Sequence, residues 1–158
     1  MSNILTPQAA VAELRSMRTF FARAPLTAEM RTARDIIHDS VSGNFANETA
    51  PDGPAWAERK DPGDGHPILH ETGALEAAAT GVGPGAINDV QGRSVDVGVD
   101  QDSVDLGGIP GARAHNEGDP SRNLPQREFM APTEEALDRI GEVIGDGVAG
   151  RLDALLVS

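Results

Sequence analysis

The sequence has no cysteine and no tyrosine, and it has a single tryptophan among its 158 residues. The lack of cysteine excludes disulfide bonds, thiolate metal sites and cysteine nucleophiles, while the cellular compartment stays open. Long apolar runs are also lacking, so the sequence predicts neither a signal peptide nor a membrane-spanning helix. We therefore expect a soluble protein that does not bind membranes.

Positive charge is scarce. Thirteen basic residues face 25 acidic ones, which gives a formal net charge of −12, and Lys60 is the only lysine. Proteins that bind nucleic acid neutralise phosphates with a basic patch, and none is visible here. The sequence therefore argues against sequence-specific nucleic-acid binding. An acidic surface would suit a conduit past which DNA slides, because it repels phosphates.

Large apolar residues are few, and loop-forming residues are common. Leu, Ile, Val and Phe together make up 34 of the 158 residues, beside 18 glycines and 11 prolines. This share lies just above the roughly 20% below which chains tend to be disordered. We expect one domain over 1–158 with a small core, long polar loops and some dependence on neighbouring subunits for order.

Apolar residues at three- and four-residue spacing predict helices at both ends of the chain. The first is expected over 7–23 and the second from an N-cap at Thr27 to a stop at Gly43-Asn44, which makes a helical pair within 1–44. A C-terminal helix is expected over 133–156, with Glu134 and Glu135 favourably placed near its N-terminus. Its apolar face is Leu137, Ile140, Ile144, Val148, Leu152 and Leu155.

The centre of the chain reads as loops around a hairpin. Residues 46–67 are rich in proline and glycine and form a loop that carries Trp56. A short helix over 72–79 is followed by the glycine run 81–85. Strands are expected over 86–90 and 94–99, joined at Gln91-Gly92, and a further short element over 109–115.

Patterns for catalysis or metal binding are weak. His66 and His70 have a spacing that could place two imidazoles on one helical face, with His115 and Glu117 as distant ligands. Pro67 opposes such a helix, so locally bonded or solvated histidines are favoured over zinc. The acidic run Asp96, Asp100, Asp102 and Asp105 lacks the glycine and glutamate of a calcium loop and favours a solvated edge.

Nucleophile and phosphate motifs are also lacking. No serine lies in a Gly-x-Ser-x-Gly elbow, and the 81–85 glycine run has no following Gly-Lys-Ser/Thr. We expect no catalytic residue, no cofactor and no metal. The alternative that remains is a metal-dependent hydrolase using His66, His70 and His115.

The segment 124–130 is the most informative part of the chain. Pro125 restricts the backbone of a segment that carries Arg127 and Phe129 and runs into the helix-start signal at 132–135. An arginine and a large aromatic in such a segment indicate a contact surface. Arg127 could pair with an acidic group across a subunit boundary, and Trp56 and Phe129 could anchor loops to the chain's own core or to a partner.

Six short segments, in order, resemble the phage virion morphogenesis family, which includes Mu-like morphogenesis proteins and the tail-completion proteins of contractile-tailed phages. The similarity runs from about 45 to 131. The chain departs from the family pattern at 109–113, where a tyrosine-alanine pair is common, and at Arg59-Lys60, where a lysine-rich segment is reduced. The six segments are Phe45, 51–56, 68–75, 97–99, 114–118 and 125–129.

The resemblance implies a small α+β domain, in which an antiparallel sheet packs against N-terminal and C-terminal helices with long polar loops. It implies a non-enzymatic structural protein of the head-to-tail junction, located in the virion neck. Copies would form a homo-oligomeric ring, a hexamer before a dodecamer, which contacts connector, head-closure or tail-tube proteins while DNA passes through. Whether such a ring terminates the tail, joins the connector or forms a collar stays open.

Overall fold

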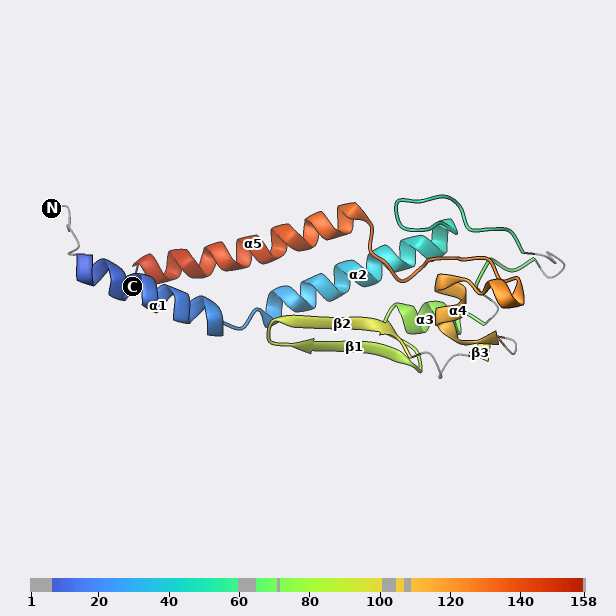
Figure 1. Ribbon diagram of the computed structural model, residues 1–158, viewed down its shortest axis with the longest axis horizontal. Coiled ribbons are helices and arrows are strands. Elements are labelled where there is room, and N and C mark those ends of the chain that lie inside the picture. The colour runs from blue at the N-terminus through green and yellow to red at the C-terminus, as the bar shows by residue number, and fades with distance from the viewer. Residues whose placement is uncertain (1–6, 60–64, 71, 101–104, 107–108, 158) are drawn as a thin grey trace.

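The computed structural model describes residues 7–59, 65–70, 72–100, 105–106 and 109–157. Its fold is α+β, as expected, with helices flanking a small antiparallel sheet. The helices are α1 Pro7–Arg23, α2 Thr27–Asn47, α3 Ala74–Ala79, α4 Gly111–Glu117 and α5 Glu134–Val157, with a 3₁₀ turn at Pro120–Arg122 (Figure 1). The strands are β1 Ala86–Gln91, β2 Ser94–Val99, β3 Asp105–Leu106 and β4 Ile109–Pro110.

The long helix α2 is the centre of the molecule. The β1–β2 hairpin and α3 pack against it on one side, and α5 runs along it on the other (Figure 1). The expected hairpin is confirmed, with Ala86 opposite Val99 and Gln91 opposite Ser94. Its turn contains Gly92 at φ +52°, a conformation that suits glycine. The short element expected over 109–115 consists of strand β4, which pairs with β3, and of helix α4, which follows it.

The predicted bounds of α1 are confirmed, but the predicted end of α2 is wrong. The helix continues past Gly43 to Asn47 and ends where Glu48 adopts the left-handed conformation at φ 52°. Its first residue is Thr27, which therefore is not the N-cap; that position is Leu26, without a side-chain capping bond. The extra turn carries Asn44 and Phe45 into the buried interior.

The start of α5 agrees with the sequence signal. The Thr133 hydroxyl accepts a hydrogen bond from the Ala136 amide at 3.3 Å, and the Asp52 carboxylate accepts one from the Glu134 amide. These side chains satisfy amides that a helix N-terminus leaves unpaired. The expected apolar face is buried only in part, because Leu137 is 53% exposed.

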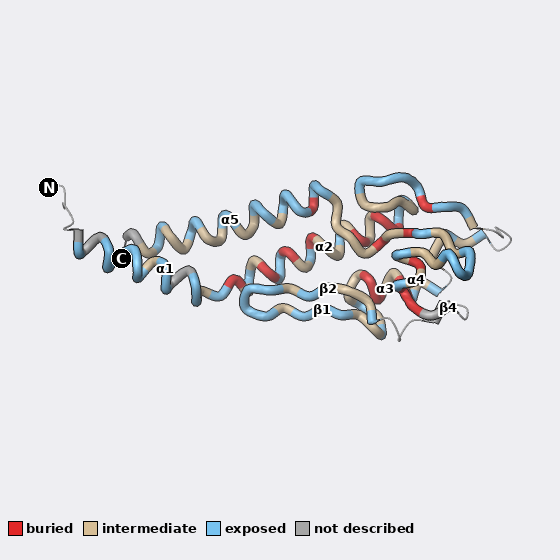
Figure 2. Tube along the Cα trace, viewed as in Figure 1, coloured by how far each residue is buried: buried red, intermediate tan, exposed pale blue. Residues whose placement is uncertain are grey.

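Burial is concentrated in α2 and in the end of the molecule formed by α3, α4 and the chain before α5 (Figure 2). One cluster there contains all three of the largest fully buried side chains, Val41, Leu75 and Phe129. No described residue of α1 is buried, and Val11 and Leu14 are 47% and 65% exposed. No described helix is both long and apolar enough to cross a membrane.

The tip of the hairpin holds the link between α1 and α2. The Leu26 amide donates to the Gly92 carbonyl at 2.8 Å, and Arg93 Nη1 donates to the Ala22 carbonyl at 3.1 Å. From the other side, Arg151 of α5 pairs with Glu29 of α2 through Nη1 and Oε1 at 2.6 Å. Contacts from both layers therefore fix the point at which α1 leaves the rest of the molecule.

Candidate functional site

The segment Pro125–Phe129 lies across the core and joins parts of the chain that are distant in sequence. Phe129 has no exposed surface, and its ring centroid lies 5.2 Å from that of Phe45. Phe45 meets Trp56 edge-to-face at 5.6 Å, and Trp56 Nε1 donates to the Glu128 carbonyl at 2.9 Å. Both predicted anchors therefore face the core of their own chain, and Trp56 ties the chain that follows α2 to the Pro125–Phe129 segment.

Two buried or half-buried asparagines bind the backbone of this segment. Asn116 Oδ1 accepts from the Phe129 and Met130 amides at 2.9 and 3.0 Å. Asn44 Nδ2 donates to the carbonyls of Phe129 and Ala131, both at 3.0 Å. A segment without helix or sheet bonding leaves polar backbone groups that must find partners when buried. The amides of α2 and α4 supply them.

The segment also approaches α4 so closely that it requires a glycine. Gly118 has φ +78°, and a Cβ there would lie 2.9 Å from the Gln126 backbone nitrogen. A larger residue would push Gln126 away and meet strain in its own backbone. Beside it, the Arg127 amide donates to the His115 carbonyl at 2.8 Å. The His115–Gly118 segment and the segment at Pro125 are thus held together.

Arg127 is a buried cation, only 7% exposed. Its Nε donates to the Ala57 carbonyl at 3.0 Å and its Nη2 to the Glu58 carbonyl at 3.2 Å. Within the described part of the chain, no carboxylate pairs with it. Burial, and after it the charge of Arg59, lowers the pKa of Arg127. The guanidinium remains protonated nevertheless, because an arginine does not lose its proton in proteins.

A small cavity of about 110 Å³ lies beside Arg127, and its lining includes Arg59, His66, His70 and His115. The three histidines of the sequence analysis therefore meet here. They come from two places, since His66 and His70 lie in the chain before α3 and His115 lies on α4. The polar side chains of the described lining carry donor nitrogens and no carboxylate.

Two of these histidines have partners that define their tautomers. Arg59 Nη2 lies 2.8 Å from His66 Nε2, which must accept, so His66 carries its proton on Nδ1 and donates to the Pro67 carbonyl at 3.1 Å. His70 Nδ1 lies 2.9 Å from Glu76 Oε2 and donates to it. In each case the partner fixes the orientation of the ring.

His115 differs because it is 7% exposed and neither ring nitrogen has a hydrogen-bond partner among the residues that the structure describes. A neutral imidazole presents one donor and one acceptor, and burying both without partners is costly. Burial, and after it the charge of Arg127, lowers the pKa of His115. The ring is therefore neutral near physiological pH and available to bind a polar group in the cavity.

The geometry favours an anion over a metal ion at this cavity. Among the described residues, no three His, Asp or Glu side chains are placed to hold a metal together. Arg59 and Arg127 would also repel a cation, since unit charges at a few ångströms interact strongly in a poorly solvated site. The alternative of a metal-dependent hydrolase centre at His66, His70 and His115 therefore meets an electrostatic obstacle here.

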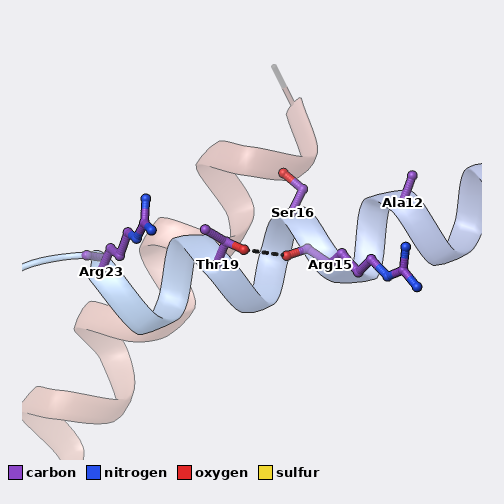
Figure 3. Close-up of a pocket in the computed structure, with 6 residues that line it drawn as sticks. Ala12, Arg15, Ser16, Thr19 and Arg23 are labelled. Atoms are coloured by element: carbon purple, nitrogen blue, oxygen red, sulfur yellow. Dashed lines mark hydrogen bonds between the residues drawn. The ribbon is translucent and has the colours of Figure 1, made fainter.

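Two other hollows lie away from Arg127. One of about 700 Å³ lies on the surface of α1, where Arg15, Ser16, Thr19 and Arg23 line it (Figure 3). Thr19 Oγ1 donates to the Arg15 carbonyl at 2.9 Å, so its hydroxyl is already bonded within the helix. The other, of about 260 Å³, lies between α2 and the start of α5. Neither combines buried charge with an unpartnered polar side chain.

Arg127 and Phe129 stand out in the sequence, but the residues that hold them do not. Asn44 was predicted only as part of a helix stop, and Asn116 belongs to the 114–118 segment without a predicted role, although a polar residue inside an otherwise apolar helical face is a usable signal. Arg59 was noted only as a departure from a family pattern. Pro125 is half-buried and begins the segment as expected.

No protein-family model, curated protein or solved structure matches this chain. The resemblance to phage virion morphogenesis proteins therefore rests on the six sequence segments alone.

Proposed function

We propose that this protein is a structural component of the head-to-tail junction of a tailed phage or phage-like particle. Copies assemble into a ring, with six subunits preferred over twelve, and the ring completes the tail or joins it to the connector. DNA passes through the ring without being read. The protein performs no catalysis in this role.

The observation that carries the proposal is the convergence of the segments on which the resemblance was based. Phe45, Trp56, Leu75 and Phe129 belong to four of these six segments, and all four side chains lie in one buried cluster. His115 and Asn116, from a fifth, bind the backbone of Arg127, Phe129 and Met130. Residues that build a core are those a shared fold would retain, so this arrangement supports the family likeness.

The surface and shape also support a role in assembly. A net charge of −12 disfavours stable contact with passing DNA. The α1 helix carries exposed Val11 and Leu14 and contributes no described residue to the buried core. Exposed apolar side chains of this kind are suited to contacts with neighbouring molecules.

Native mass spectrometry and negative-stain imaging of the full-length protein test the proposal. We expect a closed ring of six or twelve copies without bound metal. A monomer at every concentration that retains stoichiometric zinc would support the hydrolase alternative and contradict the ring. Deleting the gene from its own phage or prophage should leave unjoined heads and tails, whereas normal numbers of joined particles would exclude a role in the junction.

A further inference from the structure

The cavity beside Arg127 has the properties of an oxyanion site. Arg127 is buried and bonded to two carbonyls, Ala57 and Glu58, which stabilise a cation only in part. A buried charge is normally paired with an opposite charge, because its desolvation is costly. The guanidinium borders a cavity of about 110 Å³. An anion placed there would supply a counter-charge that no carboxylate among the described residues provides.

His115 is an independent indication that points to the same place. It lines the same cavity, is 7% exposed, and has two ring nitrogens without a partner in the described part of the chain. In its neutral form one nitrogen is a donor. An oxyanion between Arg127 and His115 would satisfy this donor while neutralising the arginine. Both buried residues are thus explained by one ligand.

The size of the cavity limits the kinds of anion that can bind there. A carboxylate has few atoms and fits such a space on the end of a flexible side chain, whereas a nucleic-acid strand must bring its sugars and neighbouring phosphates with it. A second copy of this chain, by contrast, carries 25 acidic residues. Arginine binds carboxylates with particularly favourable geometry.

We propose that Arg127 and His115 form a binding site for a carboxylate, presented by an acidic side chain of a neighbouring copy of this chain. Arg59, held against His66, adds positive charge at the edge of the site. The site belongs to the subunit contact of the assembly, so this inference rests on the ring proposed above. It specifies one contact of that ring.

Histidine-selective ¹⁵N NMR provides a direct test, because the chain has only four histidines. The full-length protein is titrated with sodium acetate at neutral pH and constant ionic strength. We expect a saturable shift of the His115 ring signals, while His38, which lies on α2 outside the cavity lining, stays unchanged. No saturable change at His115 would overturn the site.

Variants separate the site from general charge effects. Arg127→Gln should weaken acetate binding by about ten- to a hundredfold, as expected for the loss of a charged hydrogen bond. Arg113→Gln is the matched control: Arg113 lies on the same helix as His115 but is exposed and paired with Glu117. Equal weakening in both variants would contradict the proposal.

Arg127 also holds the chain at Ala57 and Glu58, so Arg127→Gln could weaken acetate binding by disturbing the fold. A second substitution separates this effect from the loss of the binding site. His115→Gln leaves those contacts in place and should also weaken acetate binding. The measurement is the rise in thermal unfolding temperature that acetate causes, which should be smaller in this variant. An unchanged rise would contradict the role of His115. Each variant's circular dichroism is compared with that of the unaltered protein.

Further experiments identify which molecule supplies the oxyanion, and they test the binding site separately from the proposed ring. If carboxylates of neighbouring copies fill the site, acetate and Arg127→Gln both reduce assembly in native mass spectra. If acetate binds but assembly is unaffected, the carboxylate does not come from a neighbouring copy, while the proposed ring still stands. Acetate binding by a permanent monomer would refute the ring and the neighbour but retain the oxyanion site. A His115 response to a short single-stranded oligonucleotide but not to acetate would assign the site to phosphate instead.

Discussion

At the scale of single residues, the stability of the molecule depends on a few side chains at one end. The Phe129 ring is fully buried and packs against Phe45. Its backbone carbonyl and amide are hydrogen-bonded to the side chains of Asn44 and Asn116. The remaining large apolar residues are spread thinly, and several of them are exposed. A change at one central position should therefore have a disproportionate effect.

We expect Phe129→Ala to lower the free energy of unfolding by about 3–5 kcal/mol, the usual cost of removing a buried phenyl ring. Urea unfolding followed by circular dichroism measures this loss. Leu137→Ala is the control, since Leu137 is 53% exposed, and its effect should stay within about 0.5 kcal/mol. Similar small effects in both variants would show that the Phe129 ring is not packed as described.

Acidification should destabilise the protein partly through His115. Because burial and Arg127 lower its pKa in the folded state, the unfolded chain binds a proton near its ordinary pKa of about 6.5 while the folded chain does not. The free energy of unfolding should therefore fall as pH decreases from about 7 to about 5, by at most about 1.4 kcal/mol per pH unit for one proton. His38, whose pKa is lowered mainly by burial, acts in the same direction.

His115→Gln removes one of these protons, so its unfolding free energy should depend less on pH over that window. Urea titrations at several pH values, without acetate or phosphate, measure the two slopes. Glu29 provides a separate effect at lower pH, because its hydrogen bond to Arg151 lowers its pKa and that contribution is lost on stronger acidification. Parallel slopes in the two proteins between about pH 7 and 5 would contradict the assignment to His115.

At the scale of elements, the helices show what the sequence could and could not predict. The ends of α1 and the strands of the hairpin follow from local signals, namely proline, glycine and apolar spacing. The end of α2 does not, because Asn44 is held by the carbonyls of Phe129 and Ala131, more than 80 residues away. The sequence grouped the three histidines of the cavity, but only as possible metal ligands, and no spacing rule joins them to Arg59 and Arg127. Local patterns thus predict elements, while tertiary contacts decide their ends and their sites.

The glycines of α5 differ in what surrounds them. A Cβ at Gly145 would meet nothing, so Gly145→Ala should stabilise the protein by up to about 1 kcal/mol through helix propensity. A Cβ at Gly147 would collide with the Glu29 side chain, which pairs with Arg151. Gly147→Ala should therefore lose this gain or reverse it. Thermal unfolding of the two variants provides the comparison, and equal stabilisation by both would contradict the packing of α5 on Glu29.

At the scale of the whole molecule, the structure is elongated. The core lies toward one end, and α1 and the last turns of α5 lie at the other (Figures 1 and 2). A compact chain of this length has a radius of gyration of about 15 Å. We expect the monomer fraction in size-exclusion-coupled X-ray scattering to exceed that value clearly. A radius at the compact value would mean that α1 folds back onto the rest of the chain in solution.

The hydrogen bonds at the hairpin tip hold α1 near its C-terminal end only, so a small rotation there moves its N-terminal end over a larger distance. Its 17 residues span about 25 Å, whereas the hydrogen bond between Leu26 and Gly92 acts at the base of the helix. A rotation of about ten degrees at that base would displace the far end by about 4 Å, roughly the width of one side chain. Small shifts in the contacts at Gly92, Arg93 and Arg151 would therefore change the direction of the whole helix.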